Sequence, residues 1–221
     1  MNAGLGESAR RRFDLTMLYA AYGAFRRDMG RMAAAGRTAG PVAGGTPATG
    51  LASPAVTNGW AVFKTHWLAQ QAAERRALWT VMRGRLTGVR AEWLEAMESQ
   101  AIRLVPLMDA VDAALEHGDR HVFGRCAHGL PASLEAHLDF KEANVLPLIH
   151  RTLTTFEWGT YDVELRGRIG VRGLRVFLPW LLDGASETTS GAVLRQLPPP
   201  VRVAHRTVWL PRYRRRDLWG H

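Results

Sequence analysis

Apolar side chains recur at alternating spacings of three and four residues over several stretches of this chain. Such spacing places them on one face of an α-helix. It predicts a first amphipathic helix from Ser8 to Ala35. Its apolar positions are Leu15, Leu18, Tyr22, Phe25, Met29 and Met32.

The same spacing returns beyond a segment, 36–58, that is rich in Gly, Pro, Ala, Thr and Ser, which we expect to be a long flexible connection. Gly118 suits the C-terminal cap of the helix predicted over about 97–115. Gly129 and Pro131 interrupt the helix predicted over 120–149, where we expect a kink or break because an interior proline removes a backbone hydrogen bond. The further helices are predicted over residues 60–86, about 97–115 and 120–149.

The last third of the chain also has helical patterns. Thr154 and Glu157 match a capping box that opens a short helix. An apolar stretch, 174–182, ends at Asp183, and a last segment runs through Val208 after a run of three prolines. We expect these pieces to be helices that wrap around a bundle.

No stretch shows the alternation or the hairpin turns of a β-sheet, so the predicted fold class is all-α. We expect an antiparallel four-helix bundle. It would occupy residues 1–153, and residues 154–221 would form a helical extension packed on it, not an independent domain.

The composition fits a folded globular protein, with 221 residues of which 47% are hydrophobic and 22% charged. These values exclude a wholly disordered chain, a collagen and a coiled coil from end to end. No apolar run reaches the roughly 18 residues that a membrane span requires. The N-terminus has no secretory apolar region and Cys126 is the only thiol, so we expect a cytoplasmic protein without internal disulfides.

The formal net charge of +9 raises the question of a nucleic-acid partner. Nearly all of the positive charge is arginine, because the only lysines are Lys64 and Lys141. The arginines are spread along the chain, apart from clusters at 10–12 and 212–216, and neither cluster lies in a known nucleic-acid-binding motif. We therefore expect a solvated basic face and no sequence-directed binding of nucleic acid.

Candidate chemistry comes from polar residues on apolar helix faces. Gln70 and Glu74 are four residues apart and share a face, whereas His137 and Glu142 are five apart and share a side only loosely. A buried carboxylate needs a partner or a metal ion. The residues therefore form either a hydrogen-bond network that fixes how the helices pack, or a site between helices.

Several segments together resemble the hemerythrin-like (HHE cation-binding) family, especially its actinobacterial members with a long C-terminal extension. The resemblance spans nearly the whole chain and implies a four-helix bundle around a non-haem diiron site that binds dioxygen or nitric oxide. The matching segments are AFRRDM at 24–29, ALWTVM at 77–82, HLDFKEANVLPLI at 137–149, FLPWLLDGA at 177–185 and LPPPVRVAHRTVWLPRYRRR at 197–216.

Most of the family's metal ligands are replaced in this chain. The resemblance places the histidine of the first helix at Tyr22 and the adjacent histidines of the second at Gln70 and Gln71. It places the Glu-His step of the third helix at Gln100 and Ala101. The histidines of three helices are therefore absent.

Three ligand positions are retained, Glu74, His137 and Glu142. One imidazole and two carboxylates are too few for two irons, which share at least five protein ligands in such sites. We therefore expect no cofactor. The alternative is a divergent non-haem iron protein that uses these three residues to bind or sense dioxygen or nitric oxide.

Our preferred hypothesis is that the bundle interior binds a small organic molecule. If that site is catalytic, His137 is the general base, Glu74 or Glu142 orients it or acts as the acid, and Tyr22 is a proton or oxyanion partner. Residues expected to line the site are Gln70, Phe25, Trp67, Met97, Ala101 and Met108. A second alternative is a structural or interaction module. The sequence assigns no reaction, ligand or oligomeric state.

Overall fold

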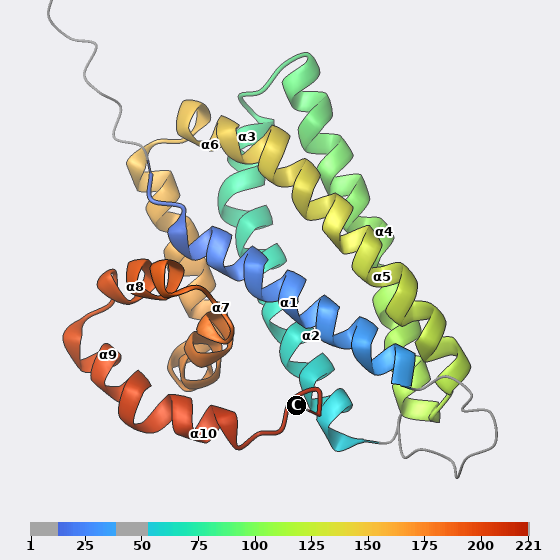
Figure 1. The fold of residues 1–221 in the computed structure, drawn as a ribbon. Coiled ribbons are helices and arrows are strands. Elements are labelled where there is room, and N and C mark those ends of the chain that lie inside the picture. Colours follow the sequence, from blue (N-terminus) through green and yellow to red (C-terminus); the bar gives the residue numbers. More distant parts are fainter. Residues whose placement is uncertain (1–12, 39–52, 221) are drawn as a thin grey trace, which may run out of the picture.

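The computed structural model describes residues 13–38 and 53–220. Within these two ranges the chain forms helices joined by short connections, and no residue is in a β-strand, which confirms the all-α prediction (Figure 1). Part of the predicted first helix, residues 8–12, and residues 39–52 of the expected connection lie outside the described residues.

The first two helices differ at their ends from the predictions. α1 spans Thr16–Thr38, and the Asp14 carboxylate accepts a hydrogen bond from the backbone N–H of Thr16 at 2.8 Å. α2 spans Pro54–Glu74, because proline suits the first turn of a helix. The connection predicted over 36–58 is therefore wrong at both ends, where its residues are helical.

The second predicted helix ends close to its expected position but contains an irregular turn. α2 continues into a π-helical turn, η1 (Arg75–Trp79), and then into α3 (Thr80–Arg83). A π-turn inserts one residue into a helix, and such turns are frequent at functional sites.

The next two helices, α4 (Val89–His117) and α5 (Arg120–Phe140), are joined by a tight turn. Gly118 ends α4 in the left-handed conformation with φ 66°, as predicted. α5 runs through Pro131 without a break, so the break expected there is wrong, because one lost hydrogen bond is outweighed by the packing of the helix. The irregularity comes later, at the π-turn η2 (Lys141–Val145), which leads into α6 (Leu146–Thr152).

The C-terminal region contains more helix than the sequence pattern indicated. The capping box of Thr154 and Glu157 is confirmed, but α7 (Thr155–Leu182) is a long element that includes the stretch 174–182. It is interrupted at Gly170, whose φ of 67° and ψ of 165° suit only glycine. The chain continues with α8 (Glu187–Arg195), α9 (Pro199–Ala204), the π-turn η3 (His205–Trp209) and α10 (Leu210–Arg214).

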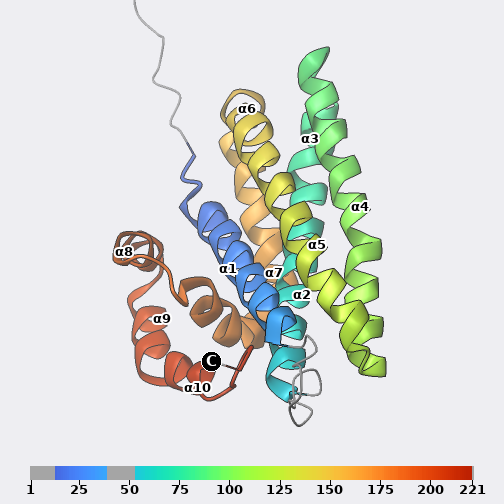
Figure 2. The same cartoon turned by 45° about the vertical axis from the view of Figure 1, so that its right-hand side comes forward.

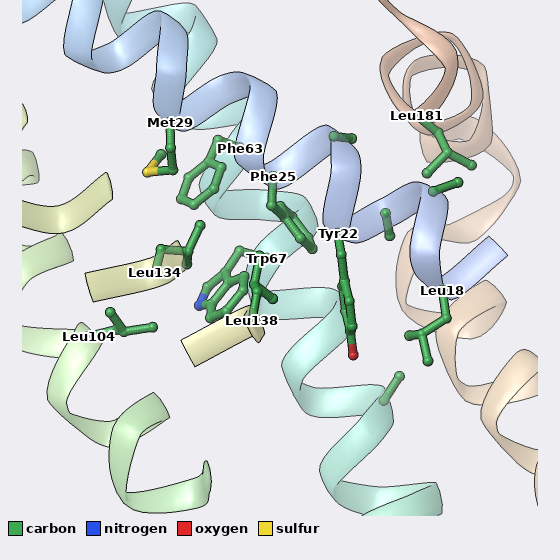
Figure 3. Packing of buried hydrophobic residues seen from close by; sticks show 14 of the residues in the cluster. Leu18, Tyr22, Phe25, Met29, Phe63, Trp67, Leu104, Leu134, Leu138 and Leu181 are labelled. Carbon is green, nitrogen blue, oxygen red and sulfur yellow. The ribbon is translucent and has the colours of Figure 1, made fainter. Parts of the chain in front are cut away.

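The helices pack around one apolar core. α1 lies against both α2 and α5, α4 packs along α5, and α7 packs along α2 (Figure 2). In Figures 1 and 2, α8, α9 and α10 lie on the opposite side of the molecule from α4. Figure 3 shows Tyr22 and Phe25 of α1, Trp67 of α2 and Leu138 of α5 in the same interior.

A group of buried and partly buried side chains fastens the end of α7 to α1. We call Arg27, Asp28, Trp180 and Asp183 the clamp. The indole N–H of Trp180 donates to the Asp28 carboxylate at 2.7 Å, and Arg27 donates to the same carboxylate at 2.9 Å and to the backbone carbonyl of Trp180 at 2.8 Å. Two of the recognised sequence segments, AFRRDM and FLPWLLDGA, therefore bind each other.

Candidate functional site

A buried ion pair joins two helices at the centre of the core. Glu74 is the last residue of α2, before η1, and Lys141 is the first residue of η2, after α5. Their side chains are both fully buried, and the Lys141 ammonium donates directly to Oε2 of Glu74. Each partner thus adjoins a π-turn.

The other oxygen of Glu74 accepts two further hydrogen bonds. The hydroxyl of Tyr22 donates to Oε1 at 2.8 Å, and the side-chain amide of Gln70 donates to it at 2.9 Å. Gln70 also donates to the hydroxyl of Tyr161 on α7 at 2.6 Å. The ion pair is therefore held by side chains from α1, α2, η2 and α7.

Burial governs the ionisation of this group. The Lys141 ammonium lies 5.0 Å from the centre of the Tyr22 ring and 5.4 Å from that of Trp79. Burial lowers the pKa of Lys141, although the attraction of Glu74 opposes that shift. Burial and the nearby carboxylate hold the pKa values of Tyr22 and Tyr161 well above the ordinary value, so both phenols stay neutral.

His137 lies one turn before Lys141 on α5 and is 1% exposed. Its ring lies 5.9 Å from that of Trp67, edge to face. Burial, and then the charge of Lys141, lower its pKa to about 3, so the imidazole is neutral at pH 7. Neither ring nitrogen has a hydrogen-bond partner.

Other polar atoms without partners lie at the level of His137. Gln70 lies one turn before Glu74, and His137 lies one turn before Lys141. Because Lys141 and Glu74 are in contact, Gln70 and His137 lie at the same height on α2 and α5. Gln100 on α4 and His137 on α5 are separated from the turn at Gly118 and Asp119 by the same number of residues. They therefore lie at the same height on these two adjacent helices. Besides both ring nitrogens of His66 and Nδ1 of His205, the buried side-chain atoms without partners among the described residues are Oε1 of Gln70, Nε2 of Gln71, Oε1 of Gln100, and both ring nitrogens of His137. We call Gln70, Gln71, Gln100 and His137 the polar layer.

Glu142 is not part of this group. Its carboxylate pairs with Arg26 at 2.8 Å at a partly exposed position, and the same guanidinium also binds Glu135 and Asp139. Neighbouring residues of a helix point about 100° apart, so Lys141 takes the inward position and Glu142 faces α1. The structure therefore brings Glu74, Tyr22 and Gln70 together but separates Glu142 from them.

The expected apolar lining is mostly in the core. Phe25 lies 5.2 Å from Trp67, ring to ring, at an interplanar angle of 82°. Met97 and Met108 are buried, whereas Ala101 is only partly buried.

These residues do not fit a diiron centre. The Lys141 ammonium occupies one oxygen of Glu74, and Glu142 is bound to Arg26. Neutral amides stand at three of the positions where the resemblance implies ligands. Across 13–38 and 53–220, no three His, Cys, Asp or Glu side chains lie close enough together to hold a metal ion.

Two members of the site, Lys141 and Tyr161, were not predicted as site residues from the sequence. Lys141 follows Leu134 and Leu138 at helical spacing, so it continues the apolar face of α5 into η2, and it is one of only two lysines. That position was a usable signal. No sequence pattern indicated Tyr161, because its contact with Gln70 depends on how α7 packs on α2.

Two surface grooves lie outside the ion pair and the polar layer. One, of about 710 Å³, runs between α1 and the α8 region and includes Tyr19, Ala24 and Ala185. The other, of about 470 Å³, lies between α2 and α4 and includes Lys64, Leu68 and Asp112. Neither is lined by a residue of the polar layer or of the ion pair.

Comparisons with protein-family models, with curated proteins and with solved structures found no match to this chain. Among the described helices, none is both long enough and apolar enough to cross a lipid bilayer.

Proposed function

We propose that this protein binds a small, uncharged, hydrogen-bonding molecule between its helices, without a metal ion. The proposal starts from the resemblance to hemerythrin-like proteins. If the resemblance holds, α1, α2, α4 and α5 of this chain are the four helices of the expected antiparallel bundle. The observation that supports it is the polar layer, where residues of α2, α4 and α5 present buried donor and acceptor atoms that lack protein partners.

An occupant of the polar layer has a clear energetic reason to bind. A buried polar atom without a partner costs about 1–3 kcal/mol, so a molecule that both donates and accepts hydrogen bonds there would remove several such penalties. Amides and a neutral imidazole offer both kinds of group.

The charges nearby favour an uncharged ligand. The ion pair already contains one positive and one negative group in direct contact. An added cation would be repelled by Lys141, and an added anion would compete with Glu74 for its partner. Neither charge would be compensated in a buried site.

The same geometry supports binding more than acid–base catalysis. Of the proposed catalytic partners, Glu142 is bound to Arg26 and Glu74 to Lys141, which leaves His137 without a carboxylate to orient it. With a pKa of about 3, His137 is also far from the range of an effective general base at neutral pH.

Metal analysis separates this proposal from the iron alternative. The protein is expressed with iron supplied, purified without chelator, and analysed for metal per chain together with its visible spectrum in air and under azide. We expect no stoichiometric iron. Near-stoichiometric iron, with a charge-transfer band that disappears in Glu74→Ala or His137→Ala, would contradict the proposal.

Ligand-observed NMR tests the binding itself. Acetamide, N-methylurea and pyrazole serve as probes, against wild type, Gln100→Leu and His137→Leu. The control variant, Met32→Leu, changes a buried side chain of the same core that carries no hydrogen-bonding group. We expect wild type and the control to bind a probe that both layer variants lose. If no probe binds and Gln100→Leu is more stable than wild type, the layer is only a structural feature of the core.

A further inference from the structure

Most of the net positive charge of this protein comes from one C-terminal stretch. Residues 188–216, which we call the C-terminal arch, contain seven arginines and no Asp or Glu. This stretch of 29 residues carries a charge of +7, against +2 for the other 192 residues of the chain. It comprises most of α8 and all of α9, η3 and α10.

The arginines of the arch are exposed and unpaired. All seven side chains are exposed, and none forms an ion pair with a carboxylate of residues 13–38 or 53–220. Several arginines elsewhere are neutralised. Arg26 binds three carboxylates, Arg83 binds Glu98, and Arg85 binds Glu157. The arch therefore presents charge that the fold itself does not use.

The arch is also an ordered support for that charge. α9, η3 and α10 follow one another without a gap over residues 199–214, a helical length of about 24 Å. His205 and Tyr213 are buried on the inner side of this segment, and both η3 and α10 contact α7. Arg202, Arg206 and Arg214 are exposed on the same segment.

We propose that the C-terminal arch binds the phosphate backbone of double-stranded DNA without reading its sequence. A duplex carries one negative charge per about 1.7 Å of its axis, so a helix of this length faces many phosphates. Guanidinium groups bind phosphate through paired hydrogen bonds. The absence of a recognised DNA-reading motif is consistent with contacts to the backbone alone.

Two observations favour a duplex over other polyanions. A helix that lies in a membrane surface needs a free apolar face. The apolar side of this segment packs towards α7, and Val203 and Val208 are the only large apolar residues that are exposed on residues 199–214. Single strands are held by aromatic side chains that stack on the bases, and Trp209 and Tyr213 of the arch are not exposed.

The test is fluorescence anisotropy with short labelled DNA duplexes of two unrelated sequences, in about 50 to 200 mM salt. The variant is Arg202→Gln/Arg206→Gln/Arg214→Gln. The matched control, Arg90→Gln/Arg103→Gln/Arg125→Gln, removes the same charge from exposed, unpaired arginines of α4 and α5. Circular dichroism and thermal unfolding check that both variants are folded.

We expect wild type to bind both duplexes with similar affinity. In the arch variant the affinity at about 100 mM salt falls at least about tenfold and the slope of log K against log[salt] decreases by about 2–3, because about three phosphate contacts are lost. The control variant changes little. Equal losses in the two variants, absence of binding at the lowest salt, or binding only to phosphatidylserine vesicles would each overturn the proposal.

Discussion

Among the residues that the structure describes, the two buried carboxylates, Glu74 and Asp28, are satisfied in different ways. Asp28 in the clamp accepts hydrogen bonds from Trp180 and Arg27, and Arg27 in turn donates to backbone carbonyls of the α7 terminus. Glu74 is also fully paired, but the residues one turn away from it are not. The clamp has the pattern of a structural joint, whereas the region beside Glu74 leaves buried polar atoms without protein partners, where we propose that a ligand binds.

The contrast extends to what each cluster connects. The clamp joins only α1 and the end of α7, through polar groups close together in sequence at each side. The ion pair, its partners and the polar layer draw on α1, α2, α4, α5, η2 and the first half of α7. Satisfied buried polar groups rigidify a fold, and unsatisfied ones destabilise it unless something else pairs with them.

The largest expected effect comes from breaking the ion pair. Lys141→Met leaves the Glu74 carboxylate buried without its cation, and we expect the free energy of unfolding to fall by about 3–5 kcal/mol, as measured by urea denaturation. Lys141→Met/Glu74→Gln, which removes both charges, should recover most of that loss. A double variant as unstable as the single one would contradict the ion-pair interpretation.

Breaking the clamp should have a somewhat smaller effect. Asp28→Ala leaves the indole N–H of Trp180 without its acceptor, and we expect a loss of about 2–4 kcal/mol in the free energy of unfolding. Asp28→Asn keeps an acceptor and should lose less. Asp109→Asn, at an exposed position, is the control for a general effect of charge. Equal stability of the two Asp28 variants would show that the hydrogen bond from Trp180 is unimportant.

The unpaired His137 predicts a pH dependence that the clamp does not share. Its pKa is about 3 when folded and 6.5 in the unfolded reference, so the unfolded chain binds the extra proton between these values. Stability is therefore lost as the pH falls below about 6.5, by up to about 1.4 kcal/mol per pH unit. His66, whose pKa burial lowers to about 4, adds to this trend.

The measurement is urea denaturation between pH 7 and pH 5, a range above most carboxylate titrations. His137→Leu should make the stability less dependent on pH, whereas His121→Leu, at an exposed position of α5, should leave the dependence as in wild type. Parallel curves for wild type and His137→Leu would show that His137 does not resist protonation in the folded state.

The smallest predicted effect concerns Gly170, which lies between the two halves of α7. The first half provides Tyr161 to the ion-pair cluster and the second provides Trp180 to the clamp. Gly170→Ala forces a side chain into a backbone conformation that suits glycine, at a cost of about 1–3 kcal/mol. Thermal unfolding should show the loss. Gly159→Ala, in a regular exposed turn of α7, should be neutral or stabilising.

The sequence by itself determined the class of fold and several local features, because these depend on neighbouring residues. Helical periodicity identified the helices, Gly118 and Thr154 ended or began them as predicted, and Glu74 and Gln70 were recognised as polar residues on an apolar face. The antiparallel four-helix arrangement and the family resemblance stay predictions.

Only the tertiary structure decided which side chains meet. Lys141 binds Glu74 of α2 and Glu142 pairs with Arg26 of α1, because these helices pack around the start of η2. Tyr161 reaches the cluster from far along the chain, through the packing of α7 on α2. Pro131 stays helical because packing outweighs its local preference. Contacts between distant residues depend on the balance of packing and burial over the whole molecule, which local sequence patterns do not contain.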